Sequence, residues 1–248
     1  LLGIIGLAIA TILGLVFQAI LLLPIALKRG HFRFKLNIFN PGVLRVFILL
    51  LPLLLANIFS KSNVLVERYL ASSMVDGSIS HLSYAFRIWS MLAILLAGIG
   101  IVIFPKMASF ASKNDTNSLR EIISVSLRVT WLIVAPVMIF GIVLALPFVT
   151  ILFQRGHFFI SDTIVVAGLL QIYLLCLPAG CFGNVTARTF YALKDTRTIG
   201  LFSSIESIVY IIYTAVLAHF WGIIGIVLGF VILYNISILW QLFIIRYK

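Results

Sequence analysis

The apolar run that decides the fold is GIIGIVLGFVILYNISILWQLFIIR, residues 222–246, in which the first charged side chain is Arg246. A helix needs about 20 apolar residues to cross the ~30 Å hydrocarbon layer of a membrane. Such runs recur along the 248-residue chain, which is 62% apolar and only 10% charged. The strands of a membrane barrel would be about half as long and would alternate apolar with polar residues. The sequence therefore predicts an all-α, polytopic transmembrane helical bundle.

The apolar runs separate into seven predicted membrane spans. They cover Leu1–Leu27, Pro41–Met74, Ile79–Ala111, Ser118–Phe153, Ser161–Leu193, Thr198–Phe220 and Gly222–Arg246. The fourth span is interrupted by Pro136 and Pro147, and the fifth contains Pro178. Because proline removes a helix hydrogen bond and clashes with the preceding turn, we expect kinks at these positions.

Lysine and arginine alternate between the loops. The loops after the first, third and fifth spans carry several each, the loops after the second and sixth carry none, and the loop after the fourth carries only Arg155. Basic residues concentrate in cytoplasmic loops, so Leu1 is predicted to lie outside and Lys248 in the cytoplasm. This distribution accounts for the net charge of +11 without a nucleic-acid partner. Since the sequence starts inside an apolar run, we expect it to be a piece of a longer protein.

The second span carries polar residues along one side. At 100° per residue, Asn57, Lys61 and Arg68 fall on one stripe, with Asn63 and Glu67 beside it. A charge at the membrane centre costs at least ~2.5–3.5 kcal/mol, so we expect this stripe to face the bundle interior or a water-filled cavity. The alternative is that the charges pair with one another or extend to the membrane surface.

Two further charges lie inside predicted spans. Arg87 is one to two turns into the third span, and its planar guanidinium suits phosphate or carboxylate; extension to the membrane surface is the alternative. Glu206, in the sixth span, is expected either to pair with an arginine near the cytoplasmic face or to take part in ion coupling. Cys176 and Cys181 are interpreted as small buried apolar residues.

No residue pattern indicates catalysis or a metal site. The sequence shows no metal-ligand spacing, nucleophile elbow or phosphate-binding glycine loop. We therefore expect a protein that is not an enzyme.

Four segments carry a resemblance to a known family: SKSNVLVERYLASSM (60–74), GSISHLSYAFRI (77–88), LFQRGHFFISDT (152–163) and RTFYALKDTRT (188–198). Their order and spacing resemble the MurJ (MviN) family of lipid II flippases, within the multidrug/oligosaccharidyl-lipid/polysaccharide (MOP) exporter superfamily. That family has two six-helix lobes followed by two more helices. It moves undecaprenyl-diphosphate-linked peptidoglycan precursor from the inner to the outer leaflet of the bacterial inner membrane by alternating access.

The resemblance implies a domain plan and partners. Residues 1–27 would be the last helix of the first lobe, 28–45 a basic cytoplasmic linker, and 46–248 the second lobe of a MATE/MOP-like inverted two-lobe transporter. The implied partners are a lipid-linked anionic glycan, membrane lipids, and the missing first lobe and last two helices. These would lie in the same full-length chain or in a second chain.

The resemblance also implies a binding site. Arg87 matches a cavity arginine and is assigned to the diphosphate or headgroup, with Lys61 and Asn63 in the same cationic half-cavity. Glu67 matches an acidic position that contributes to a cation site in some members, and Glu206 is a second candidate ion or charge partner. No cofactor or metal is expected, and coupling to Na⁺ or to the membrane potential stays open.

The remaining residues of the matching segments are given structural roles. In LFQRGHFFISDT, Gly156 allows a tight turn, and Asp162 with Thr163 caps the next helix. Arg155 is expected to bond helix-end carbonyls, which is favoured over contact with cargo. The same structural class includes Arg188, Asp195 and Arg197.

This sequence departs from the family pattern, and these departures leave other functions open. Phe86 replaces a usual aspartate, Lys61 a usual glutamine, and Gln154 a usual glutamate. The alternatives are a flippase or exporter for another polyprenyl-diphosphate glycan or a drug, and a transport-inactive remnant or structural membrane subunit.

Overall fold

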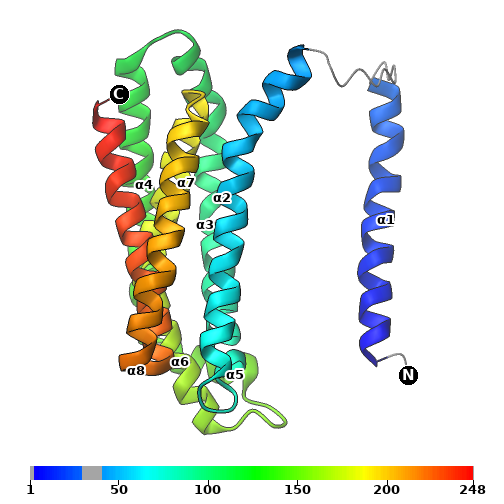
Figure 1. Ribbon diagram of the computed structural model, residues 1–248, viewed down its shortest axis with the longest axis vertical. Coiled ribbons are helices and arrows are strands. Elements are labelled where there is room, and N and C mark those ends of the chain that lie inside the picture. Colours follow the sequence, from blue (N-terminus) through cyan, green and yellow to red (C-terminus); the bar gives the residue numbers. More distant parts are fainter. Residues whose placement is uncertain (1–2, 30–40, 248) are drawn as a thin grey trace. The chain divides into compact units, whose positions relative to one another are not determined.

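The computed structural model describes residues 3–29 and 41–247, and these residues form eight helices and no strands (Figure 1). They are α1 (Gly3–Arg29), α2 (Pro41–Ser72), α3 (Ser78–Ser112), α4 (Thr116–Val143), α5 (Ala145–Phe153), α6 (Ile160–Leu174), α7 (Leu177–Ala192) and α8 (Thr196–Tyr247). The predicted all-α fold is confirmed for this part of the chain. The predicted linker, residues 28–45, lies mostly outside the described residues, as do Leu1 and Lys248.

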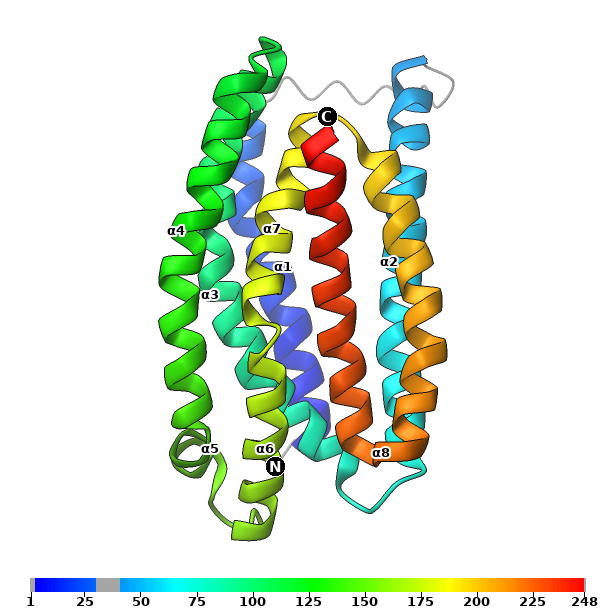
Figure 2. The same ribbon diagram turned by 90° about the vertical axis from the view of Figure 1, so that its left-hand side faces the viewer.

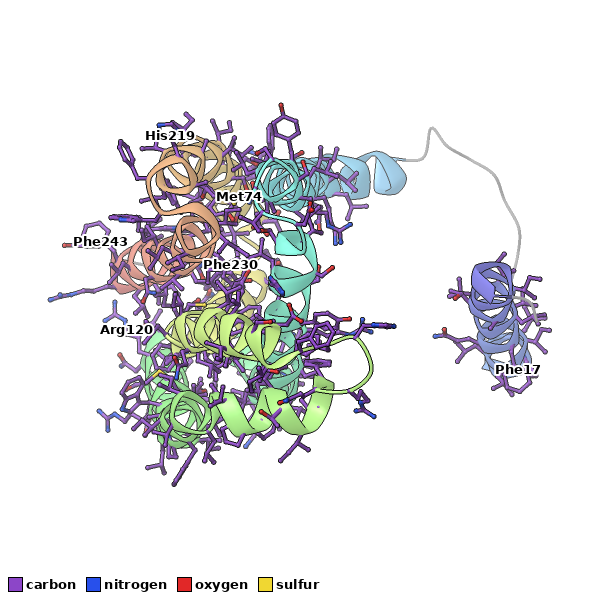
Figure 3. The ribbon with its side chains drawn as sticks, turned by 90° about the horizontal axis from the view of Figure 1, so that it is seen from below. Phe17, Met74, Arg120, His219, Phe230 and Phe243 are labelled. Carbon is purple, nitrogen blue, oxygen red and sulfur yellow. The ribbon has the colours of Figure 1, made fainter. Side chains whose placement is uncertain are left out.

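The chain divides into two compact units, Leu1–Val46 and Phe47–Lys248. In the first unit, α1 is apolar over most of its length and ends in Lys28 and Arg29. Its described large side chains are exposed, among them Phe17, whose relative exposure is 63% (Figure 3). A helix that is apolar all round is suited to lipid or to other apolar helices. The division into two lobes stays a prediction.

In the second unit the helices run back and forth between two ends (Figures 1 and 2). One end holds the α3–α4 turn, the α7–α8 turn and the C-terminal end of α8. The other end holds the α2–α3 turn, the α5–α6 hairpin and the sharp break inside α8. Figure 2 shows α2 beside the first half of α8, and both helices run in the same direction.

The helices break close to three positions at which the sequence predicts a kink or a boundary between spans. A break at Leu144 separates α4 from α5, just before Pro147, whose ring would clash with the carbonyl of Val143. The pair α6 and α7 bends by 42° immediately before Pro178. In α8, Gly222 has a φ of 56° and a ψ of −136°, which divides the 52-residue helix into two. The kink expected at Pro136 is not a break, since α4 continues through it.

The predicted count of seven spans remains a prediction. By length and composition, the described residues contain three helices suited to crossing a membrane, namely α3, α4 and α8. The bent pair α6–α7 makes a fourth. A straight helix of 52 residues would extend about 78 Å, far more than the ~30 Å hydrocarbon layer of a membrane. The break at Gly222 coincides with the predicted boundary between the sixth and seventh spans.

The core of the second unit lies between α3, α6, α7 and α8. Tyr173, Leu174 and Ile226 are fully buried there, and Phe230 projects between the helices (Figure 3). A smaller cluster around Met107 lies nearer the end with the α3–α4 turn. The outward faces are also apolar, as at Leu132, which is 75% exposed. Apolar residues on both the inner and outer faces are expected of a bundle surrounded by lipid.

Candidate functional site

Positive charge is concentrated at one end of the second unit. Near the α3–α4 and α7–α8 turns and the end of α8 lie Lys106, Lys113, Arg120, Arg188, Lys194, Arg197 and Arg246. At the opposite end, Arg155 is the only lysine or arginine in the turns between the described helices. The folded chain therefore has the alternation that the sequence predicted, with one basic end.

The polar residues of α2 divide between two faces of the helix. Lys61 and Arg68 are exposed, whereas Asn63 is 94% buried and Glu67 is turned toward α8. The expected single half-cavity containing both Lys61 and Asn63 is therefore not formed. The physical reason is their spacing: two residues apart on a helix, they point about 200° apart.

Glu67 and Asn63 are held by the first half of α8. The Tyr210 hydroxyl donates a hydrogen bond to the Glu67 carboxylate, and one turn earlier the Asn63 amide donates to Ser207 Oγ at 3.3 Å. These bonds set the register of the two parallel helices. In the described part of the chain, neither Lys61 nor Arg68 forms an ion pair with Glu67.

Glu206 lies on the same half of α8 but bonds to the second half. Ser237 Oγ donates to one carboxylate oxygen at 3.1 Å, and the Trp240 indole donates to the other. Of the two roles expected for Glu206, pairing with an arginine is wrong within the described residues, because both of its bonds come from neutral donors.

Arg87 is ten residues into α3, about 14 Å along the helix axis from its start. Its side chain is exposed, and no described residue bonds to its guanidinium. The adjacent Phe86 packs against Trp89, Tyr173 and Phe230, with ring centroids 5.4–5.9 Å apart. Arg87 therefore has no acidic neighbour in sequence.

The hairpin between α5 and α6 is fixed by its own polar groups. Gly156 has a φ of 62°, the left-handed conformation that glycine adopts without strain. The Arg155 guanidinium donates to the Leu152 carbonyl at 2.6 Å, which is the contact that the sequence favoured. Asp162 accepts the Phe159 amide at 2.9 Å, at the start of α6, and its other oxygen lies 2.9 Å from Nε2 of His81 on α3.

At the basic end, two aspartates cap helices in the same way. The Ser118 amide donates to Asp115 and the Thr198 amide donates to Asp195, both at 3.1 Å, so the carboxylates begin α4 and α8. The hydrogen bonds from Ser118 lower the pKa of Asp115. Both aspartates are therefore helix N-caps.

The two arginines next to the α7–α8 turn differ. Arg188 Nε donates to Asn184 Oδ1 at 2.9 Å, and both side chains lie over Gly100 of α3, where an added Cβ would be 2.9–3.0 Å from them. Arg197 is exposed. Arg188, on α7, therefore packs closely against α3 at Gly100.

Sequence reasoning did not find the partners of the membrane-embedded acids. Tyr210, Ser237 and Trp240 lie in apolar spans, where single aromatic and polar side chains are common. The available signal was the three-residue spacing of Ser237 and Trp240, which places both on one side of the second half of α8.

This all-helical bundle, with one basic end and charged groups among its apolar helices, has the fold of solved transporters of the MOP superfamily. A solved MATE-family transporter of the MOP superfamily superposes with a TM-score of 0.69 at 14% identity, over 78% of this chain and 42% of that one, which shows the shared fold. A structure of lipid II flippase MurJ in an inward closed conformation gives a TM-score of 0.72 at 25% identity, over 88% of this chain and 46% of that one.

The sequence comparisons are more specific. The family model for lipid II flippase MurJ matches residues 2–247, and the chain belongs to this family. A probable lipid II flippase MurJ of Bdellovibrio bacteriovorus is 28% identical over 92% of this chain and 44% of its own length. One from Vibrio cholerae is 30% identical over 90% and 43%. The chain thus spans less than half the length of these relatives, and its family consists of transporters rather than enzymes.

Proposed function

We propose that residues 46–248 of this chain are the second lobe of a lipid II flippase of the bacterial inner membrane, with the basic end of this lobe in the cytoplasm, and that residues 1–27 are the last helix of the first lobe. The support is the MurJ family match over residues 2–247, together with the charge alternation between the two ends of the bundle. Basic loops concentrate on the cytoplasmic side of membrane proteins. The C-terminal end of α8 would then be cytoplasmic.

The observation that carries the proposed cargo is the exposed guanidinium of Arg87. An arginine at this depth needs water, an anion or another charge. Its planar fork can bond two oxygens of a diphosphate at once, which lysine cannot do. Lys61 and Arg68 present further positive charge on the exposed face of α2. Asn63, which is buried against α8, is not part of this cationic site.

One lobe cannot alternate between two membrane faces, so a first lobe must complete the cavity. The exposed cationic face of α2 supports a water-filled space there, because lipid would not accommodate Lys61 and Arg68. We place the first lobe and the last two helices of the family plan in the full-length protein that contains this chain.

The test is complementation of a bacterium depleted of its own lipid II flippase. The complete gene should restore wall synthesis, Arg87→Ala should abolish rescue, and Arg87→Lys should rescue only weakly. Arg120→Ala is the matched control, since Arg120 is an exposed arginine at the basic end and should be dispensable. The amount of each variant in the membrane fraction must stay unchanged, because insertion depends on apolar length. Normal rescue by Arg87→Ala would refute the headgroup role.

A further inference from the structure

An apolar cavity of about 270 Å³ lies in the second unit among α3, α4, α5 and α6. Every described residue that lines it is apolar, and Phe140, Leu144 and Phe148 among them are exposed, so the cavity lies at the surface of the bundle. Two local features leave this space. Gly141 contributes no side chain, and the chain turns at Leu144 from α4 into α5, which Figure 2 shows nearly end-on.

A second cavity, of about 390 Å³, lies at the hairpin between α5 and α6, and we call it the hairpin cavity. It is lined by Tyr84 of α3, Leu152 and Phe153 of α5, and Arg155, His157 and Phe158 of the hairpin. The three aromatic rings pack together with centroids 4.7–6.1 Å apart. No acidic residue is among the described residues that line this cavity, so it suits a negative group.

The two cavities lie next to each other along the same two helices. On α3, Tyr84 lines the hairpin cavity and Ile88 lines the apolar cavity; on α5, Leu152 and Phe148 do the same. Residues four apart share a helix face and are about 6 Å apart along the axis. A cationic space therefore continues into an apolar one, which matches a molecule with an anionic head and an apolar tail.

Arg155 is held in place but keeps donors for a ligand. One nitrogen of its guanidinium donates to the Leu152 carbonyl, and within the described residues the side chain forms no ion pair. A guanidinium has five N–H donors, so most of them stay available. Its planar fork can bond two phosphate oxygens at once. The hairpin bond thus fixes the direction of the fork as well as the turn.

The surface around the hairpin cavity is apolar. Ile151 of α5 is 78% exposed, and Phe159 and Ile160 at the start of α6 are exposed as well. Exposed apolar residues beside basic and aromatic ones are typical of the membrane–water interface. A ligand that reaches both cavities is therefore a component of the membrane rather than a soluble anion.

We propose that the two cavities together bind one membrane phospholipid, with its phosphate on Arg155 and His157 and part of one acyl chain in the apolar cavity. With the basic end in the cytoplasm, as proposed above, this lipid belongs to the outer leaflet. Binding itself does not depend on which molecule the protein moves.

This lipid site is separate from the cationic face of α2. Phe86 lines a cavity with Glu67 and Arg68, and on α3 it points about 160° away from Ile88. In both Figure 2 and Figure 3, α2 and the α4–α5 pair lie on opposite sides of the second unit. The phospholipid therefore does not occupy the space proposed for the diphosphate of the cargo.

The experiment measures binding of tritiated dioleoyl phosphatidylglycerol to the full-length protein purified in dodecyl maltoside. The wild type should bind saturably. Arg155→Gln should weaken binding about tenfold, the effect of one lost charge-assisted hydrogen bond. Val137→Phe, which puts a ring into the apolar cavity, should weaken it at least as much. Leu144→Phe, at an exposed position of the same cavity, replaces Val137→Phe if that variant does not fold.

Two matched controls should bind like the wild type. Val129→Phe makes the same change at an exposed position of α4 that lines neither cavity, and Arg120→Gln removes an exposed arginine at the opposite end of the unit. Dioleoylglycerol has the same chains without the phosphate, and glycerol 3-phosphate has the phosphate without the chains. Each should displace the labelled lipid at least tenfold less effectively than unlabelled phosphatidylglycerol.

Several outcomes would overturn the lipid site. Unchanged binding to both Arg155→Gln and the cavity-filling variant would place the lipid elsewhere. Displacement by dioleoylglycerol as effective as by phosphatidylglycerol would leave only an apolar surface, and effective displacement by glycerol 3-phosphate would make the hairpin a site for a soluble anion. Stronger displacement by lipid II than by phosphatidylglycerol would assign the two cavities to the cargo and refute the phospholipid.

Discussion

Gly225 lies where the two halves of α8 contact each other. A Cβ added there would lie 2.1 Å from the backbone oxygen of Leu217, whereas ordinary van der Waals contact begins near 3.4 Å. The alanine side chain therefore requires the two halves to separate by about 1.3 Å, the difference between 3.4 and 2.1 Å. The obstacle is main chain, so it cannot rotate away. Close approach at small residues is a recurrent way for membrane helices to pack.

The expected cost of Gly225→Ala follows from two opposing effects. Overpacking costs about 1–3 kcal/mol, while replacing glycine by alanine inside a helix stabilises by about 0.5–1 kcal/mol. Because the clash is with main chain, the upper end of the overpacking cost applies, and the net result should be a loss of about 2 kcal/mol. Gly98 in α3 is the matched control, because an added Cβ meets nothing within 4 Å there, and Gly98→Ala should be neutral or stabilising.

The purified full-length variants are heated in detergent to a series of temperatures. Unfolding is measured as the loss of the fraction that stays monodisperse on size-exclusion chromatography. Gly225→Ala should unfold at a lower temperature than the wild type, and Gly98→Ala at the same or a higher one. A Gly225→Ala protein as stable as the Gly98→Ala protein would show that the two halves of α8 are not in this close contact. The predicted overpacking between Gly225 and Leu217 would then be wrong.

Substitutions at three further positions test two local interactions and the role of Lys61. Tyr210→Phe removes the donor to the Glu67 carboxylate and should cost about 2 kcal/mol of stability in the same thermal assay; an unchanged midpoint would show that this bond is absent. Asp195→Ala removes the cap from Thr198 and should cost about 1 kcal/mol, whereas Asp195→Asn should restore most of it; equal losses would argue against capping. Lys61→Gln should complement a depleted strain almost normally, because Lys61 is exposed and glutamine is usual in the family. Severe loss of rescue would point to a partner outside the described residues.

The fold class and most helix boundaries follow from local sequence. Long apolar runs form helices wherever they occur in a membrane, because the backbone has no water to bond with. Breaks near Pro147, Pro178 and Gly222 follow from backbone chemistry within a few residues. The alternation of basic loops, with Arg155 as its exception, is likewise a property of the linear chain.

The site depended on contacts between helices distant in sequence. Helical periodicity placed Lys61, Asn63 and Glu67 around α2 but did not tell which side would meet α8, because rotation about the helix axis is set by packing. Asn63 and Ser207 are separated by 144 positions, and Glu67 and Tyr210 by 143. The charges and their helix could therefore be predicted from sequence, whereas the separation of the exposed Lys61 and Arg68 from the half-buried Glu206 arises only when α2, α7 and α8 pack together.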